Sequence, residues 1–180
     1  MPDYQEISRR IVAIHQAVDE AQTLERVLSF ALTAVECDMA GVITSSSGVL
    51  TSSAVTAPAV RASDHLQFAL DEGPGLAAML DGTSVLVDDT QTDQRWPRWG
   101  SRASNLSIRS ALSAPMREDT TTVGSLNLYA HRVGAFDEAD LDVTVILAHH
   151  ATVAYLISSK ASAAVRAIDT RTTIGQAEAS

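Results

Sequence analysis

Apolar side chains surround residues 137–160 almost completely, and this feature constrains the fold more than any other in the sequence. Acidic residues open the segment, as the dipole of a helix favours at its N-terminus, and Phe136 precedes it. A helix that is apolar on all sides must be covered on more than one side. We therefore expect one side to pack on a sheet, and the other to pack on an N-terminal helix or a second subunit.

Two further helices are predicted at the N-terminal end, over residues 5–19 and 23–36. The first carries a single apolar stripe with helical spacing, and a stripe of this kind at a chain end needs a partner to bury it. We therefore predict a homodimer, and we place its interface on this stripe and on the long C-terminal helix. The predicted interface residues are Ile7, Ile11, Ile14, Val18 and Tyr155.

Five short β-prone runs predict the sheet. The first two form a hairpin within residues 38–56, and the others cover residues 83–87, 108–115 and 121–129. In the last run, leucines alternate with Ser125, Asn127 and Tyr129, a period of two that gives one apolar and one polar face. The order of elements has no regular βαβ alternation, which disfavours a parallel Rossmann sheet and favours an antiparallel α+β fold.

The strongest break in the chain is Gly73-Pro74-Gly75, between a helix predicted from Asp64 and a short helix predicted over residues 76–80. A phosphate-binding loop would need a following Lys-Ser or Lys-Thr pair, which is absent here. The motif is therefore interpreted as a turn. An irregular helix is predicted to start at Arg95.

The charge balance argues against binding to polyanions. The net charge is −9, whereas a surface that binds nucleic acid or anionic lipid needs a basic patch. The one dense basic run is Arg95, Arg98 and Arg102. No apolar stretch was found of the roughly 18 residues that a membrane span needs, and the N-terminus lacks the apolar core of a signal peptide. We expect a cytoplasmic protein with no membrane contact.

The sequence offers little reactive chemistry. Cys37 is the single cysteine, which excludes an intramolecular disulfide and a thiolate metal cluster. His149 and His150 are adjacent in a helix, so they point about 100° apart and cannot both bind one metal ion. No Gly-x-Ser-x-Gly elbow occurs. We expect no catalytic residue, no metal and no enzymatic activity.

Six short motifs, in their order and spacing, resemble those of a GAF domain, and more narrowly the GAF half of bacterial GAF–ANTAR transcription antiterminators. The motifs are Glu72–Leu76, the region of Asp88, Arg95–Pro97, Ser110–Ser113, Gly124–Tyr129 and Phe136–Asp137. The tail from Arg171 to Glu178 is similar to the opening of an ANTAR domain, the RNA-binding part. We accordingly divide the chain into an N-terminal helix over 1–20, a GAF-like domain over 21–160, and a linker with the start of a missing or truncated ANTAR-like domain over 161–180.

The resemblance implies a central antiparallel sheet of five or six strands, with the terminal helices on one face and pocket-forming helices and loops on the other. It implies a small-molecule sensor in a transcription antitermination regulator, signalling through its terminal helices. RNA binding is left open for a longer parent and is not expected of this chain. A ligand-free dimerisation scaffold is the alternative, and a GAF-type enzyme is a third interpretation.

A pocket requires a few placed polar groups in an apolar wall. No cofactor is assigned, and the ligand is an unidentified small molecule. Trp96 and Trp99 could stack on a flat ligand or fold a loop onto the core. The asparagine of the cyclic-nucleotide motif is present, but Leu128 stands where that motif has lysine, which argues against that ligand class. The predicted ligand-binding residues are Phe68, Met79, Trp96, Trp99, Ser113, Asn127 and Tyr129.

Overall fold

The computed structural model describes the backbone of residues 20–177 and the side chains of residues 22–161 and 163. The helix predicted over residues 5–19, with Ile7, Ile11, Ile14 and Val18, lies outside the described residues. Within the described part, the element order is α2 (Glu20–Ala34), β1 (Met39–Ser46), β2 (Val49–Val55), α3 (Pro58–Leu70), α4 (Pro74–Asp81), β3 (Val85–Val87), α5 (Pro97–Asn105), β4 (Ser110–Glu118), β5 (Thr121–Ala130) and α6 (Glu138–Ala177).

The five strands form one sheet in the order β2-β1-β5-β4-β3, and every neighbouring pair is antiparallel. This confirms the predicted α+β fold. The alternation in β5 divides the sheet into two faces, because successive side chains of a strand point to opposite sides. Leu126 and Leu128 join the core on one face, and Tyr129 joins a second core on the other.

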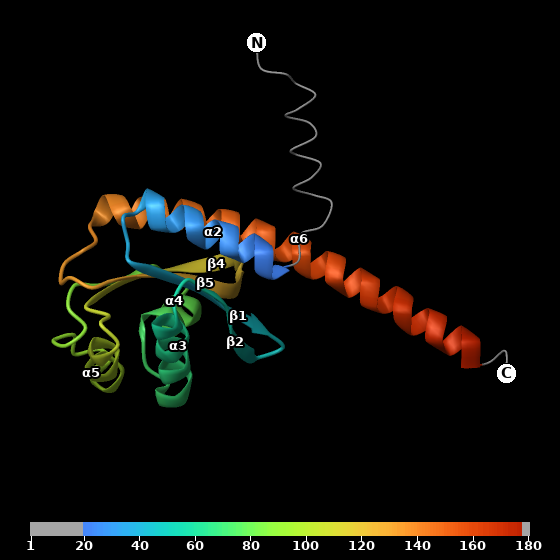
Figure 1. Ribbon diagram of the computed structural model, residues 1–180, viewed down its shortest axis with the longest axis horizontal. Coiled ribbons are helices and arrows are strands. Elements are labelled where there is room, and N and C mark those ends of the chain that lie inside the picture. The colour runs from blue at the N-terminus through green and yellow to red at the C-terminus, as the bar shows by residue number, and fades with distance from the viewer. Residues whose placement is uncertain (1–19, 178–180) are drawn as a thin grey trace, which may run out of the picture.

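Helices α2 and α6 cover the first face of the sheet (Figure 1). Leu24 and Leu28 of α2 and Leu147 and Ala151 of α6 are buried together with the leucines of β4 and β5. This arrangement explains why the sequence of α6 is apolar on several sides, because the helix contacts both the sheet and α2. Tyr155 is 8% exposed and belongs to the same core. Its place in a dimer interface stays a prediction, and within the chain its side chain packs against this core.

Helices α3, α4 and α5 lie on the opposite face (Figure 1). Val60, Ala78 and Trp99 pack there with Tyr129 in the second core. The distribution of helices over the two faces is the one that the sequence predicts.

Several helix limits differ from the predictions by two or three residues, and two differ by more. Helix α3 begins at Pro58 instead of Asp64, because proline suits the first turn of a helix, where its missing N–H is not needed. Helix α6 was expected to end near residue 160 but continues to Ala177. Its distal part is rich in alanine, the residue with the highest helix propensity, which extends the helix beyond the edge of the sheet (Figure 1).

Within the described residues, one helix is long and apolar enough to cross a membrane by length and composition. It is the Glu138–Ala161 part of α6, with a mean hydropathy of 1.4. The sequence interpretation missed this stretch. Its buried side packs in the core with the sheet, and the core helix of a globular domain passes the same test.

Candidate functional site

A row of polar side chains crosses the sheet on the face covered by α3 and α4. Asn127 of β5 pairs in register with Ser113 of β4 and with Gly41 of β1. Ser125 lies two residues before Asn127 on the same face, and Tyr129 lies two residues after it. All four polar side chains are completely buried. The structure therefore brings together three of the predicted ligand-binding residues, Ser113, Asn127 and Tyr129.

Several atoms of this row have no hydrogen-bond partner. They are the amide nitrogen and oxygen of Asn127 and the hydroxyls of Ser113 and Ser125. A buried polar group without a partner costs about 1–3 kcal/mol, and groups of this kind require a specific explanation. A row of such atoms on one face marks the place where the fold supplies donors and acceptors that the chain itself does not use.

Gln67 connects the three elements around this row. Its Oε1 accepts hydrogen bonds from the backbone N–H groups of Gly75, at 2.9 Å, and of Leu76, at 3.3 Å. Its Nε2 donates to the hydroxyl of Tyr129 at 3.3 Å. A side chain of α3 thus satisfies two of the donors that the first turn of α4 leaves open, and holds both helices against β5.

Only Gly73 of the Gly-Pro-Gly motif lies outside a helix, because α4 already begins at Pro74. The predicted turn is therefore confined to the residues just before α4, and the motif sets the distance between α4 and the sheet. Gly73 has φ of 140°, a conformation that is open to glycine and strained for other residues. A Cβ atom at Gly75 would lie 2.9 Å from Oδ1 of Asn127. The helix backbone therefore rests directly on the polar row.

The two tryptophans are buried to different extents. Trp99 is buried in the second core, and its indole N–H donates to the hydroxyl of Ser63 on α3 at 3.2 Å. Trp96 is half-buried, with the guanidinium of Arg95 4.5 Å from its ring centroid. Both residues pack the α5 segment against the neighbouring layer, which is the second of the two roles that the sequence leaves open.

Glu72 joins this segment to α3 and α4. Its carboxylate accepts hydrogen bonds from the backbone N–H of Arg98 and of Trp99, at 3.0 and 3.1 Å, and from Nε of Arg98 at 2.6 Å. The hydrogen bonds from Arg98 hold the pKa of Glu72 below its usual value. Arg95 is likewise paired with Asp93, so these two arginines of the basic run are engaged inside the chain.

A buried carboxyl group lies on the same side of the sheet. Asp64 of α3 is completely buried, and its Oδ2 accepts a hydrogen bond from the hydroxyl of Ser52 on β2 at 2.5 Å. Its Oδ1 has no hydrogen-bond partner. Burial raises the pKa of Asp64 to about 7, against smaller opposing effects from Ser52 and Arg61.

Phe68 and Met79 do not join the polar row. Both are half-buried, and the ring of Phe68 packs near that of His65 at 6.1 Å between centroids. The sequence interpretation missed Asp64 and Gln67, and it placed Ser125 on the polar face of its strand without including it in the ligand-binding set. A signal for the first two was present, because the buried residues of α3, Val60, Ser63, Asp64 and Gln67, have the i, i+3, i+4, i+7 spacing of one helix face.

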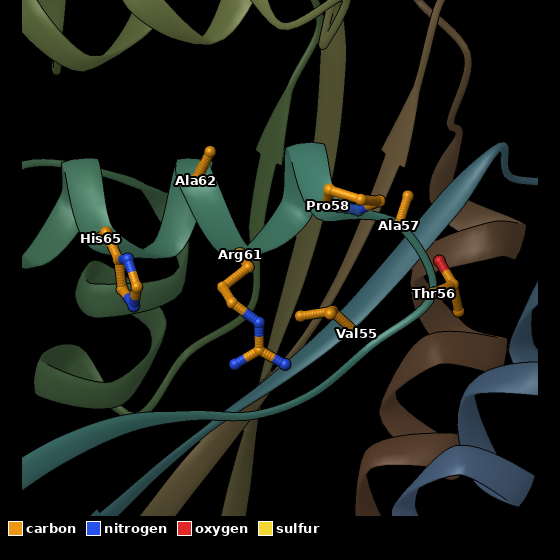
Figure 2. A pocket seen from close by; sticks show the side chains of 7 residues that line it. All are labelled: Val55, Thr56, Ala57, Pro58, Arg61, Ala62 and His65. Atoms are coloured by element: carbon orange, nitrogen blue, oxygen red, sulfur yellow. The ribbon is translucent and has the colours of Figure 1, made fainter.

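A surface cavity with a volume of about 460 Å³ lies between β2 and α3. Figure 2 shows Arg61 and His65 extending from the same side of α3 over this cavity, beside Val55. Nη1 of Arg61 donates to the backbone oxygen of Ser52 at 2.9 Å. Because Arg61 both lines the cavity and contacts Ser52, the cavity is adjacent to the Ser52–Asp64 pair.

Among the described residues, no group of three or more His, Cys, Asp or Glu side chains could hold a metal ion. Cys37 is buried in the first core, on the face of the sheet opposite the polar row. Burial raises the pKa of its thiol to about 11. The site is therefore a set of hydrogen-bonding groups and one carboxyl, suited to binding a polar molecule.

The fold and this site define a small α+β domain with a buried polar layer under two helices. The model of the GAF domain family matches residues 17–155, and the chain belongs to this family. No curated protein matches the sequence significantly.

Solved structures agree on the fold at low sequence identity. The GAF domain region of a Geobacter sulfurreducens protein has 21% identity and a TM-score of 0.63, over 84% of this chain and 99% of that chain. The GAF domain of an Acinetobacter phosphoenolpyruvate-protein phosphotransferase has 18% identity and a TM-score of 0.63, over 90% and 99%. A free methionine-R-sulfoxide reductase from Neisseria meningitidis, in complex with its substrate, has 16% identity and a TM-score of 0.63, over 89% and 95%.

Proposed function

We propose that this domain senses a small molecule that binds between the sheet and helices α3 and α4. The observation that carries the proposal is the row of buried, unpartnered polar atoms of Ser113, Ser125 and Asn127. A ligand with complementary groups would supply the hydrogen bonds that these atoms lack, and their desolvation cost would be offset on binding. An apolar wall with a few placed polar groups is typical of small-molecule sites.

The site is closed in this conformation, because its side chains are fully buried and α4 rests on Asn127. Binding therefore requires α3 and α4 to move away from the sheet. A ligand can shift that equilibrium only by its difference in affinity for the closed and open states. Since Tyr129 and Leu128 are neighbours in β5 and face opposite layers, a displacement of β5 would reach α6 and its distal extension.

The regulatory context is a further part of the proposal. The sequence resemblance to GAF–ANTAR proteins favours a cytoplasmic transcription antitermination regulator, with RNA binding by a longer parent. For this chain we propose no nucleic-acid and no membrane partner, in keeping with the net charge of −9. The pairing of Arg95 with Asp93 and of Arg98 with Glu72 supports this, since it reduces the free positive charge of the one basic run.

We propose a non-enzymatic role although free methionine-R-sulfoxide reductases are among the similar structures. Reduction by a thiol requires an accessible thiolate. The single cysteine, Cys37, is buried on the face away from the site and has a raised pKa. A lone buried thiol of this kind is poorly suited to a redox cycle that needs a second thiol.

Native mass spectrometry tests the sensing role. The native mass of protein purified from a bacterial host is compared with its mass after denaturation. A reproducible added mass is expected for the native wild type. Asn127→Leu should lose this mass, since it removes both unpartnered amide atoms, whereas Gln91→Leu at an exposed loop position should retain it. Absence of any added mass, together with unchanged stability after incubation with extracts of small metabolites, would reject the proposal.

A ligand-free dimerisation scaffold is the second candidate, and exposed apolar residues on α6 favour it. Ile146, Val153 and Ile157 are 58%, 45% and 57% exposed and lie along one side of the helix. A second copy of the chain could bury this side. The two candidates are compatible, because a sensor that signals through α6 would use the same helix for pairing.

A further inference from the structure

A β-bulge in β2 turns the side chain of Ser52 toward Asp64. The register of β1 and β2 shifts between Val42 and Ile43, which pair with Ala54 and Ser52 respectively, so that Ser53 is the extra residue. Ala54 faces the α2–α6 core, whereas Ser52 donates its hydroxyl to Asp64 on the other side. Bulges redirect side chains and are frequent beside functional sites. Without the bulge, the alternation of the strand would place Ser52 and Ala54 on the same face.

The Ser52–Asp64 pair belongs to the same layer as the polar row. Ile43 pairs with Ser52 on one side and with Ser125 on the other. These three residues therefore form one line across β2, β1 and β5. With strands about 4.8 Å apart, Ser52 and Ser125 are separated by about 10 Å, with a buried isoleucine between them. A small molecule could span this distance, with polar groups at both ends and an apolar middle.

Asp64 is only partly satisfied within the chain. Its Oδ2 has one donor and its Oδ1 has none, although the residue is completely buried. Arg61 is the one arginine of α3, which has no lysine, and its guanidinium donates to the backbone oxygen of Ser52. A buried carboxylate left with a single hydroxyl donor is costly, because burial of charge requires pairing and hydrogen bonding. The ionised form of Asp64 therefore lacks a partner, and a group that donates hydrogen bonds and carries positive charge would supply one.

We propose that Oδ1 of Asp64 anchors a positively charged nitrogen of the ligand, so that the sensor responds to small amine-bearing compounds. This inference rests on the proposed sensing function and adds the ligand class. The amine lies over Ser52 at the β2 end of the site, the body of the ligand lies over Ile43, and its other end meets Ser125 and Asn127. The cavity lined by Arg61 and His65 lies beside this end (Figure 2), which makes it the expected route of entry.

Two probes with one skeleton test the charge requirement. Benzylamine carries an ammonium group where benzyl alcohol carries a hydroxyl. Binding of each is followed by amide chemical shifts of isotope-labelled protein. Benzylamine is expected to shift the amides around Ser52 and Asp64, with an affinity at least about tenfold above that of benzyl alcohol, as suits a hydrogen bond between charged groups.

Asp64→Asn keeps the shape of the side chain and removes the charge, and should abolish the tenfold preference. Asp81→Asn makes the same exchange at an exposed position of α4 and should leave the preference intact. Ser52→Ala removes the one hydrogen bond that Asp64 accepts, and this bond lowers the pKa of Asp64. The variant should therefore weaken the preference near neutral pH, which provides a second test if Asp64→Asn alters the fold.

Equal affinity for the two probes, or unchanged preference in Asp64→Asn, overturns the inference. The sensing function and the role of Asp64 are rejected by different outcomes. If an added mass is retained by the wild type and persists in Asp64→Asn, the sensor stands and the role of Asp64 falls. If neither probe shifts any amide of the site and no added mass is found, both are rejected.

Discussion

The backbone N–H of Gly75 donates a hydrogen bond to Oε1 of Gln67 at 2.9 Å, and this hydrogen bond links α4 to α3 over the sheet. The same oxygen accepts a second hydrogen bond from Leu76. The amide nitrogen of Gln67 reaches Tyr129. One side chain therefore holds the helical layer closed above the polar row, and its removal should loosen that layer.

Gln67→Leu is expected to lower the free energy of unfolding by about 2–4 kcal/mol, since it leaves two buried N–H groups without their acceptor. Urea denaturation followed by circular dichroism measures the change. Gln91→Leu is the matched control, because Gln91 is an exposed loop residue, and it should change stability by about 0.5 kcal/mol or less. Equal effects of the two substitutions would contradict the role given to Gln67.

Asp64 predicts an unusual dependence of stability on pH. Its pKa is raised from 3.8 to about 7 by burial, so between these values the folded state holds a proton that the unfolded state has lost. The contribution of this residue is therefore favourable at low pH and is lost as pH rises from about 4 to 7. The difference in pKa corresponds to about 4 kcal/mol.

The variant Asp64→Asn lacks this titration. Its free energy of unfolding, relative to wild type, should rise by about 4 kcal/mol between pH 4 and pH 8. Glu72, Asp89 and Asp93 have lowered pKa values and act in the opposite sense, but they are present in both proteins and cancel in the difference. A difference that is constant with pH would mean that Asp64 titrates normally.

The hydroxyl of Ser63 is the acceptor for the buried indole of Trp99. Ser63→Ala should lower the free energy of unfolding by about 1–3 kcal/mol, because the indole N–H is left without a partner in an apolar layer. Thermal or urea unfolding measures it, with Ser101→Ala at an exposed position as the control. An unchanged stability would show that Trp99 finds another acceptor.

Much of the fold was predictable because its signals are local. The alternation of leucines with Asn127 and Tyr129 defines the two faces of the sheet within a single strand, and the apolar surround of residues 137–160 predicts a helix packed on several sides. The limits of α3 were less accessible. Pro58 can end a hairpin or begin a helix, and only the tertiary packing of the residues that follow decides between the two.

The site was predictable where it follows the period of a strand, and missed where it depends on contacts between elements. Ser113, Asn127 and Tyr129 stand at alternating positions that the sequence displays. Asp64 and Gln67 are polar residues in a helix, and such residues usually face solvent. The bulge that aims Ser52 at Asp64 is set by the pairing of β1 with β2 and leaves no pattern in either strand alone.

Cys37 should be unreactive in the folded protein. Burial raises the pKa of its thiol from 9.0 to about 11, so at pH 8 the thiolate fraction is about 100-fold below that of an unshifted thiol. Alkylation by iodoacetamide should therefore be slow in buffer and fast in denaturant. Rapid alkylation of the native protein would contradict this expectation, since it would require an accessible thiol with an ordinary pKa.

The exposed side of α6 predicts the oligomeric state. Ile146 and Val153 are separated by seven residues, about two turns, and so lie on one side of the helix. Glutamate at both positions would place charge where a second copy buries apolar surface. We expect Ile146→Glu with Val153→Glu to convert a dimer into a monomer of 19.1 kDa, measured by light scattering.

Val49→Glu with Leu80→Glu makes the same exchange at two exposed apolar residues outside α6 and should leave the dimer intact. A dimer that survives the α6 exchange and dissociates on Ile11→Glu with Ile14→Glu would place the interface on the N-terminal stripe instead.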